Sequence, residues 1–68
     1  MRLSARNQIT ATVTDVHEGA AIANVHLDAG GAHLVASITM EAVRDLGLTK
    51  GSQVVAVIKA SDVILATP

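Results

Sequence analysis

The 68-residue sequence contains no phenylalanine, tyrosine, tryptophan or cysteine, and only one proline. Without aromatic rings, the core must be built from Val, Ile, Leu, Ala and Met, which bury less area per side chain. Without cysteine, neither a disulfide nor a thiolate zinc site can stabilise the fold. A chain this short buries only about 60% of its unfolded surface, yet 50% of its residues are hydrophobic. We therefore expect one domain whose missing stability comes from other copies of the chain, in an obligate homo-oligomer.

Basic residues and long apolar runs are also scarce. The chain has five Lys and Arg residues and a net charge of −1, which disfavours a nucleic-acid partner bound through its phosphates. No apolar run approaches the ~18 residues of a membrane span. The N-terminus leads from Met1 straight into a polar stretch, without the apolar segment of a signal peptide. The sequence thus predicts a cytoplasmic protein with no membrane partner and no nucleic-acid partner.

Alternation of apolar and polar residues predicts three strands in the first half of the chain, over residues 9–17, 21–28 and 33–38. Glu18-Gly19 is typical of a turn or bulge between the first two. Ala29-Gly30-Gly31 predicts a tight hairpin between the second and third, because glycine supplies the positive φ that short loops need.

The period then becomes helical. Thr39 is a predicted N-cap and Gly47 a predicted C-terminal cap of a helix of about two turns. Residues 53–60 predict a fourth strand and residues 63–66 a fifth. This order, with one short helix between strands three and four, predicts an all-β fold: a five-stranded OB-like barrel in which residues 1–68 form a single domain.

Catalytic chemistry has little support. An enzyme needs a nucleophile with a base, a carboxylate pair or an open metal site. His17, His26 and His33 lie in different predicted strands without HxH or HxxxH spacing, and we expect them at the surface or at an interface. The acidic residues are scattered singly, and no Gly-rich phosphate loop is present. We predict that the protein is not an enzyme and has no organic cofactor.

Two short polar segments suit an anion better. Ser4-Ala5-Arg6-Asn7 precedes the first predicted strand, and Lys59-Ala60-Ser61 stands between the fourth and fifth. Such breaks leave backbone N–H groups outside the ladder, where they can converge on an anion. Ser hydroxyls donate hydrogen bonds, while Arg6 and Lys59 offset part of the charge. The same segments can also be a plain surface stretch and a simple turn, since motifs this short recur by chance. The residues alone leave both interpretations open.

The chain as a whole resembles the molbindins, or Mop proteins, which are small cytoplasmic molybdate-binding proteins. The resemblance rests on four segments and covers essentially the whole chain: SARNQ, VTDVHEGAAIANVHL, SITMEAVRDLGL and IKASDV. It implies an OB-like barrel that assembles as a hexamer, a trimer of dimers. It also implies that molybdate or tungstate is held between subunits through hydrogen bonds, with no directly coordinated metal, for intracellular storage or homeostasis.

The resemblance also implies which residues hold the oxyanion. Ser4 to Asn7 and Lys59 to Ser61 form one side of the site, and a partner subunit faces them with Ser37-Ile38-Thr39. A second class of site, near threefold axes, is assigned to Glu18-Gly19-Ala20-Ala21. The expected site residues are therefore Ser4, Ala5, Arg6, Asn7, Gly19, Ala20, Ser37, Thr39, Lys59, Ala60 and Ser61.

Two nucleic-acid functions are weaker alternatives. Residues 42–65 resemble the swapped-hairpin DNA-binding modules of transition-state regulators, but this covers only the C-terminal half and basic residues are few. An OB-type binder of single strands stacks bases on aromatic side chains, and this sequence has none.

Overall fold

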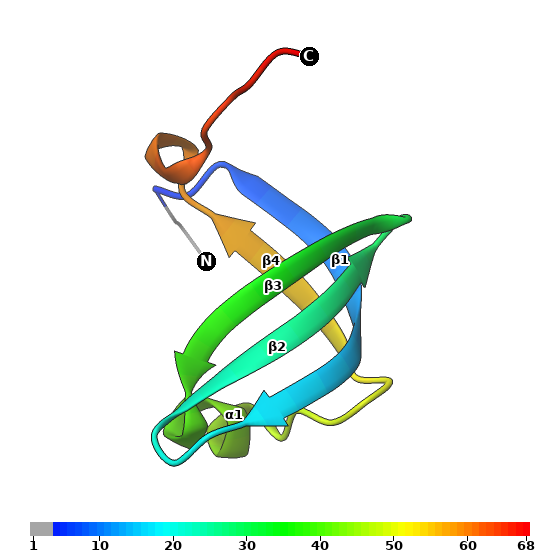
Figure 1. Ribbon diagram of the computed structural model, residues 1–68, viewed down its shortest axis with the longest axis vertical. Coiled ribbons are helices and arrows are strands. Elements are labelled where there is room, and N and C mark those ends of the chain that lie inside the picture. Colours follow the sequence, from blue (N-terminus) through cyan, green and yellow to red (C-terminus); the bar gives the residue numbers. More distant parts are fainter. Residues whose placement is uncertain (1–3) are drawn as a thin grey trace.

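The computed structural model describes residues 4–68 and shows one antiparallel sheet with the strand order β3-β2-β1-β4 (Figure 1). A short helix follows β3, and a 3₁₀ turn follows β4. The elements are β1 (Asn7–Glu18), β2 (Ile22–Ala29), β3 (Ala32–Thr39), α1 (Met40–Leu46), β4 (Gln53–Ile58) and the 3₁₀ turn (Ala60–Asp62). The first four predicted strands and the helix are confirmed, with ends that differ by two residues at most.

The core lies on the concave face of the sheet and at the end that α1 covers. It is wholly aliphatic apart from one methionine, as the absence of aromatic residues requires. Its buried members are Ala11, Val13, Ala23, Val25, Leu27, Met40 and Val43. The side-chain oxygen of Thr39 accepts a hydrogen bond from the N–H of Ala42 at 3.1 Å, and Gly47 ends the helix at φ 62°. Both predicted caps are confirmed.

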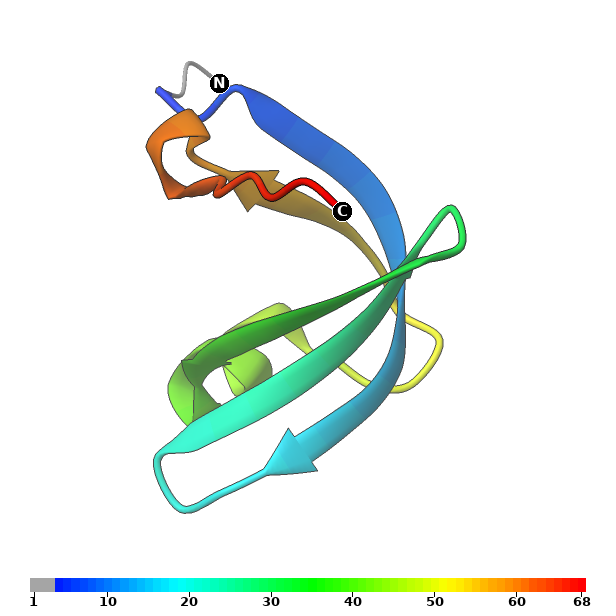
Figure 2. The same cartoon turned by 45° about the horizontal axis from the view of Figure 1, so that its top comes forward.

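A β-bulge in β1 changes which side chains face the core. The ladder pairs Val13 with Leu27 and then Asp15 with His26, so that Thr14 is the extra residue. Without the bulge, strict alternation from the buried Val13 would turn Asp15 and His17 inward. With it, both are exposed and Val16 is half-buried. Figure 2 shows the strong curvature of this strand.

The prediction of a fifth strand and a closed barrel is wrong for the single chain. Strand β4 ends at Ile58 rather than at residue 60, and residues 63–68 belong to no strand. Among the described residues, β3 pairs only with β2 and β4 only with β1, so the sheet is not closed. Residues 63–66 have strand-like composition, but a strand also needs a neighbour whose backbone groups it can pair. In Figure 1 the C-terminal segment leads away from the sheet.

The two open edges border an apolar groove of about 290 Å³. Leu34 and Ile38 of β3 line one side, Val54 and Ile58 of β4 line the other, and Leu46 of α1 closes one end. In the C-terminal segment that follows, Ile64 is 92% exposed and Leu65 is 88% exposed. Within residues 4–68, no helix has the length and hydropathy needed to cross a bilayer.

Candidate functional site

The two polar segments singled out above lie side by side. Strands β1 and β4 run antiparallel, and their register starts with the pair Asn7–Ile58. The side-chain amide of Asn7 also donates to the carbonyl oxygen of Ile58 at 3.1 Å. Residues 4–6 enter β1 at the same end where Lys59 leaves β4, and both segments lie at that end in Figures 1 and 2. The fold thus joins segments that are more than 50 residues apart.

The segment after β4 forms a single 3₁₀ turn. The N–H of Asp62 donates to the carbonyl of Lys59 at 2.8 Å, and the N–H of Val63 donates to that of Ala60 at 3.2 Å. The first N–H groups of a helical turn have no partner within it. Among the described residues, no backbone carbonyl of a turn or loop accepts a hydrogen bond from the N–H of Ala60 or of Ser61. They are therefore available to an anion.

Most side chains at this end are exposed, and two of them, Arg6 and Lys59, are basic. Ser4, Arg6, Lys59 and Ser61 are exposed, while Ala5 and Asn7 are half-buried. Within residues 4–68 the one ion pair joins Asp15 and His17, so no carboxylate neutralises Arg6 or Lys59 there. In a single chain these donors lie on an open surface, so a bound anion would be covered on one side only.

The end of β3 does not meet these segments within one chain. Thr39 pairs with Ile22 and Ser37 with Asn24, at the end of the sheet next to α1. Figure 1 places this end opposite the N-terminal segment and the 3₁₀ turn. Within one chain, Ser37 and Thr39 thus lie apart from Ser4–Asn7. That they face these residues from a partner subunit stays a prediction.

Gly19 and Ala20 form a tight turn beside the helix. The N–H of Gly19 donates to the carbonyl oxygen of Ile22 at 3.0 Å. A Cβ atom on Gly19 would lie 2.6 Å from that oxygen, so only glycine fits here. The carbonyl of Ala21 accepts from the N–H of Met40 at 2.8 Å, which ties the turn to the start of α1. Ala20 itself is exposed.

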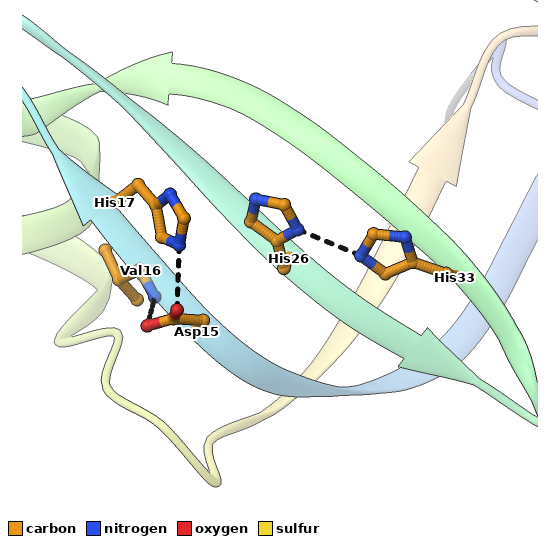
Figure 3. Close-up of polar contacts among 5 residues, drawn as sticks. All are labelled: Asp15, Val16, His17, His26 and His33. Carbon is orange, nitrogen blue, oxygen red and sulfur yellow. Dashed lines mark hydrogen bonds and ion pairs between the residues drawn. The ribbon is translucent and has the colours of Figure 1, made fainter.

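The three histidines lie together, which the sequence-based prediction did not include. Nδ1 of His26 and Nε2 of His33 are hydrogen-bonded at 2.9 Å, and the ring centroids of His17 and His26 are 4.7 Å apart (Figure 3). The expected surface placement is confirmed, with His17 and His33 exposed and His26 half-buried. The predicted hairpin at residues 29–31 held the signal, because it brings residues 26 and 33 to neighbouring positions on facing strands.

A carboxylate stands at one end of this row. Nε2 of His17 lies 2.8 Å from Oδ2 of Asp15, and the N–H of Val16 donates to Oδ1 of Asp15 at 2.9 Å. The hydrogen bond from His17, followed by that from Val16, holds the pKa of Asp15 below its ordinary value.

Known proteins resemble this chain over its full length. The family model described as the TOBE domain matches residues 3–65. A probable molybdenum-pterin-binding protein of Haemophilus influenzae is 38% identical over 66 residues, which cover 96% of each chain. The structure of a molybdate binding protein from Sporomusa ovata matches with a TM-score of 0.94 at 37% identity, over 98% of this chain and 100% of that one.

A third match is a larger protein. The cytoplasmic molybdate-binding protein ModG, solved with molybdate bound, matches with a TM-score of 0.94 at 49% identity. The match covers 100% of this chain and 49% of ModG. All three relatives are named for what they bind rather than for a reaction.

Proposed function

Because the chain belongs to the TOBE-domain family, and within it to the molbindins (Mop proteins), we propose that it binds molybdate at the seams of a cytoplasmic homo-oligomer. Tungstate, which has nearly the same size and charge, is the second expected ligand. The protein stores or buffers the oxyanion and catalyses no reaction. The observation that carries this proposal is the Asn7–Ile58 pairing, which places Ser4–Asn7 beside Lys59–Ser61.

The chemistry of this end fits a tetrahedral dianion. The hydroxyls of Ser4 and Ser61 and the N–H groups of Ala60 and Ser61 can donate hydrogen bonds to its oxygens. Arg6 and Lys59 add charge-assisted hydrogen bonds without a competing carboxylate partner in the described part of the chain. The anion is held through its oxygens, so its metal atom needs no protein ligand and the site needs no organic cofactor.

A second copy supplies the rest of the site. Ser37 and Thr39 are exposed at the other end of the sheet, and from a neighbouring copy they can complete the donor set. The oxygen of Thr39 accepts the N–H of Ala42 in its own chain, which leaves the hydroxyl proton of Thr39 available to donate to the anion. Gly19 and Ala20 belong to a second class of site, where several copies meet.

The open sheet supports an assembly. Both edges of the sheet are unpaired in the described chain, and the groove between them is lined by aliphatic side chains. Ile64 and Leu65 are almost fully exposed on a segment that lies outside the sheet. We propose that residues 63–66 of one copy enter the groove of another as its fifth strand. Reciprocal exchange makes a dimer, and three dimers make the hexamer.

Exchange of this segment would also build the anion site. Lys59–Ser61 directly precede residues 63–66, so the assembly step fixes the position of the anion donors. The same coupling means that molybdate stabilises the oligomer, since a ligand that binds only the assembled state favours it. The swapped-hairpin DNA-binding alternative has no such support, because the stretch that resembles it, residues 42–65, has only three basic residues, Arg44, Lys50 and Lys59.

Replacing Lys59 tests the anion site. Loss of one charge-assisted hydrogen bond costs about 1.5–3 kcal/mol, so Lys59→Ala should weaken molybdate binding about 10- to 150-fold by isothermal titration calorimetry. Lys50→Ala is the control, because Lys50 is also exposed but lies in the turn before β4. Native mass spectrometry, with and without molybdate, gives the number of chains and of bound anions. Unchanged affinity in Lys59→Ala would show that residues 59–61 are only a turn.

A further inference from the structure

His17, His26 and His33 form a row across the outer face of three strands (Figure 3). The rings of His26 and His33 are stacked at 21° with centroids 5.0 Å apart. Nδ1 of His26 and Nε2 of His33 are only 2.9 Å apart. The ring of His17 packs on the other side of His26 at a centroid distance of 4.7 Å. Two imidazole nitrogens thus approach each other closely at the protein surface.

Two features of the fold build this row. The hairpin register pairs Asp28 with His33 and His26 with Val35, which leaves His26 and His33 as diagonal neighbours. The bulge at Thr14 turns Asp15 and His17 to the outer face, where Asp15 pairs with His26. Bulges of this kind are used to re-aim side chains. The row therefore depends on a specific irregularity of β1 as well as on the strand pairing.

The charges around the row favour a cation. Strands β1, β2 and β3 contain no lysine or arginine, so no fixed positive charge belongs to this sheet face. Asp15 lies opposite His26 and Asp28 lies opposite His33. Oδ1 of Asp28 accepts the N–H of Gly31 at 3.0 Å, which fixes this carboxylate next to the hairpin turn. Two carboxylates therefore flank the close pair of imidazoles.

We propose that His26 and His33 form a chelating site for a divalent transition metal ion, Cu²⁺ or Ni²⁺. Imidazole nitrogen is a preferred ligand of these ions. Over residues 4–68 no three His, Asp or Glu side chains are placed to share one ion, so the ion has two protein ligands and completes its coordination with water. Asp15 and Asp28 act as nearby negative charges rather than as ligands.

The spacing of the two nitrogens suits a chelate with its two ligands at a right angle. With metal–nitrogen bonds of about 2.05 Å, two ligands at a right angle stand about 2.9 Å apart, and two tetrahedral ligands stand about 3.4 Å apart. The hydrogen bond between the two rings holds the nitrogens 2.9 Å apart, so a right-angled Cu²⁺ or Ni²⁺ ion can replace the bridging proton with little change of this spacing. Binding needs a lone pair on each nitrogen, so the ring that donates the hydrogen bond moves that proton to its other nitrogen through water. Two neutral imidazoles then replace one hydrogen bond by two metal bonds.

His17 is a positioning residue in this site. Its Nε2 is held by Asp15 at 2.8 Å, and its ring packs on that of His26. This contact limits the rotation of the His26 ring, but it gives the ion no third nitrogen. His17 thus offers a matched control, because it is a histidine of the same row that the proposal leaves out of the ligand set.

The test is a titration of untagged protein with NiCl₂ by calorimetry, on wild type and on His26→Gln, His33→Gln and His17→Gln. Wild type should bind one Ni²⁺ per chain. His26→Gln and His33→Gln should each lower the Ni²⁺ affinity at least about tenfold, since even the loss of an outer-shell partner costs about that much. His17→Gln should lower it less. With CuSO₄, the electron paramagnetic resonance spectrum should show coupling to two nitrogens in wild type and to one in His33→Gln.

The molybdate affinity of each variant is measured in parallel. It should be unchanged, because the row lies on the outer face of β1–β3 and the proposed oxyanion segments adjoin the paired ends of β1 and β4. Failure of the oxyanion site would therefore leave the Ni²⁺ result intact. Equal Ni²⁺ affinity in wild type and His33→Gln would overturn the chelate, as would a loss in His17→Gln as large as that in His33→Gln.

Discussion

The exposed C-terminal segment gives a direct test of the proposed exchange of residues 63–66 between copies. In the single chain Ile64 is 92% exposed and Leu65 is 88% exposed, so nearly all of their apolar surface remains to be buried. Neighbouring residues of a strand point to opposite faces, so in the proposed exchange one of the two would turn into the groove of the second copy. Burial of one such side chain contributes about 1.5–3 kcal/mol.

In a reciprocal exchange each of the two copies buries one such side chain, which gives about 3–6 kcal/mol for each pair of chains. Replacing the inward side chain by serine should therefore weaken dimer association about 10²- to 10⁴-fold, since 1.4 kcal/mol is a factor of ten. The variants are Ile64→Ser, Leu65→Ser and the double variant. Ala66→Ser is the control, because it adds the same hydroxyl to the same segment while removing little apolar surface.

Sedimentation velocity over a range of protein concentrations measures this effect. We expect the oligomer of one single variant to dissociate at a much higher protein concentration than that of the other. The double variant should dissociate like the single variant with the less stable oligomer. Molybdate affinity should fall with the assembly, because residues 59–61 immediately precede this segment. The exchange model fails if the double variant sediments as the wild-type oligomer, or if the wild type is a folded monomer at micromolar concentration.

Two further predictions concern local structure. Gly19→Ala should lower the free energy of unfolding by about 1–3 kcal/mol, because a Cβ atom 2.6 Å from the Ile22 carbonyl oxygen forces the turn open and breaks its hydrogen bond. Urea unfolding measures this loss, and Ala20→Ser is the control that should change stability little. Equal urea midpoints for the two variants would contradict the clash. Asp15→Asn should destabilise the protein only above about pH 4. The pKa of Asp15 is lowered in the fold, so its ionised carboxylate stabilises the folded state, and this stabilisation is lost as the pH falls and the carboxylate is protonated. A pH-independent difference between Asp15→Asn and wild type would show that the His17 contact is irrelevant to stability.

The polar segments show how much of a site a sequence pattern can indicate. Ser4–Asn7 and Lys59–Ser61 stood out because polar donors interrupt apolar strands, and this needs no knowledge of the fold. Their closeness follows from the register of β1 with β4, which begins at Asn7 and Ile58. Alternation in either strand is compatible with several registers, so the pairing that brings the two segments of the candidate site together was open until the strands were placed.

Local periodicity was sufficient for β2, β3 and α1, because each has one buried face and defined ends at Gly30-Gly31, Thr39 and Gly47. Periodicity reports which face of a segment is apolar, and this depends only on nearby residues. It could not reveal the bulge at Thr14, which keeps Asp15 and His17 at the surface, or the meeting of His26 with His33. It also predicted a strand over residues 63–66, where the segment has the composition of a strand but finds no partner strand among the described residues of the single chain. Strand partners, register and bulges depend on contacts between distant segments, and those contacts form only when the whole chain has folded.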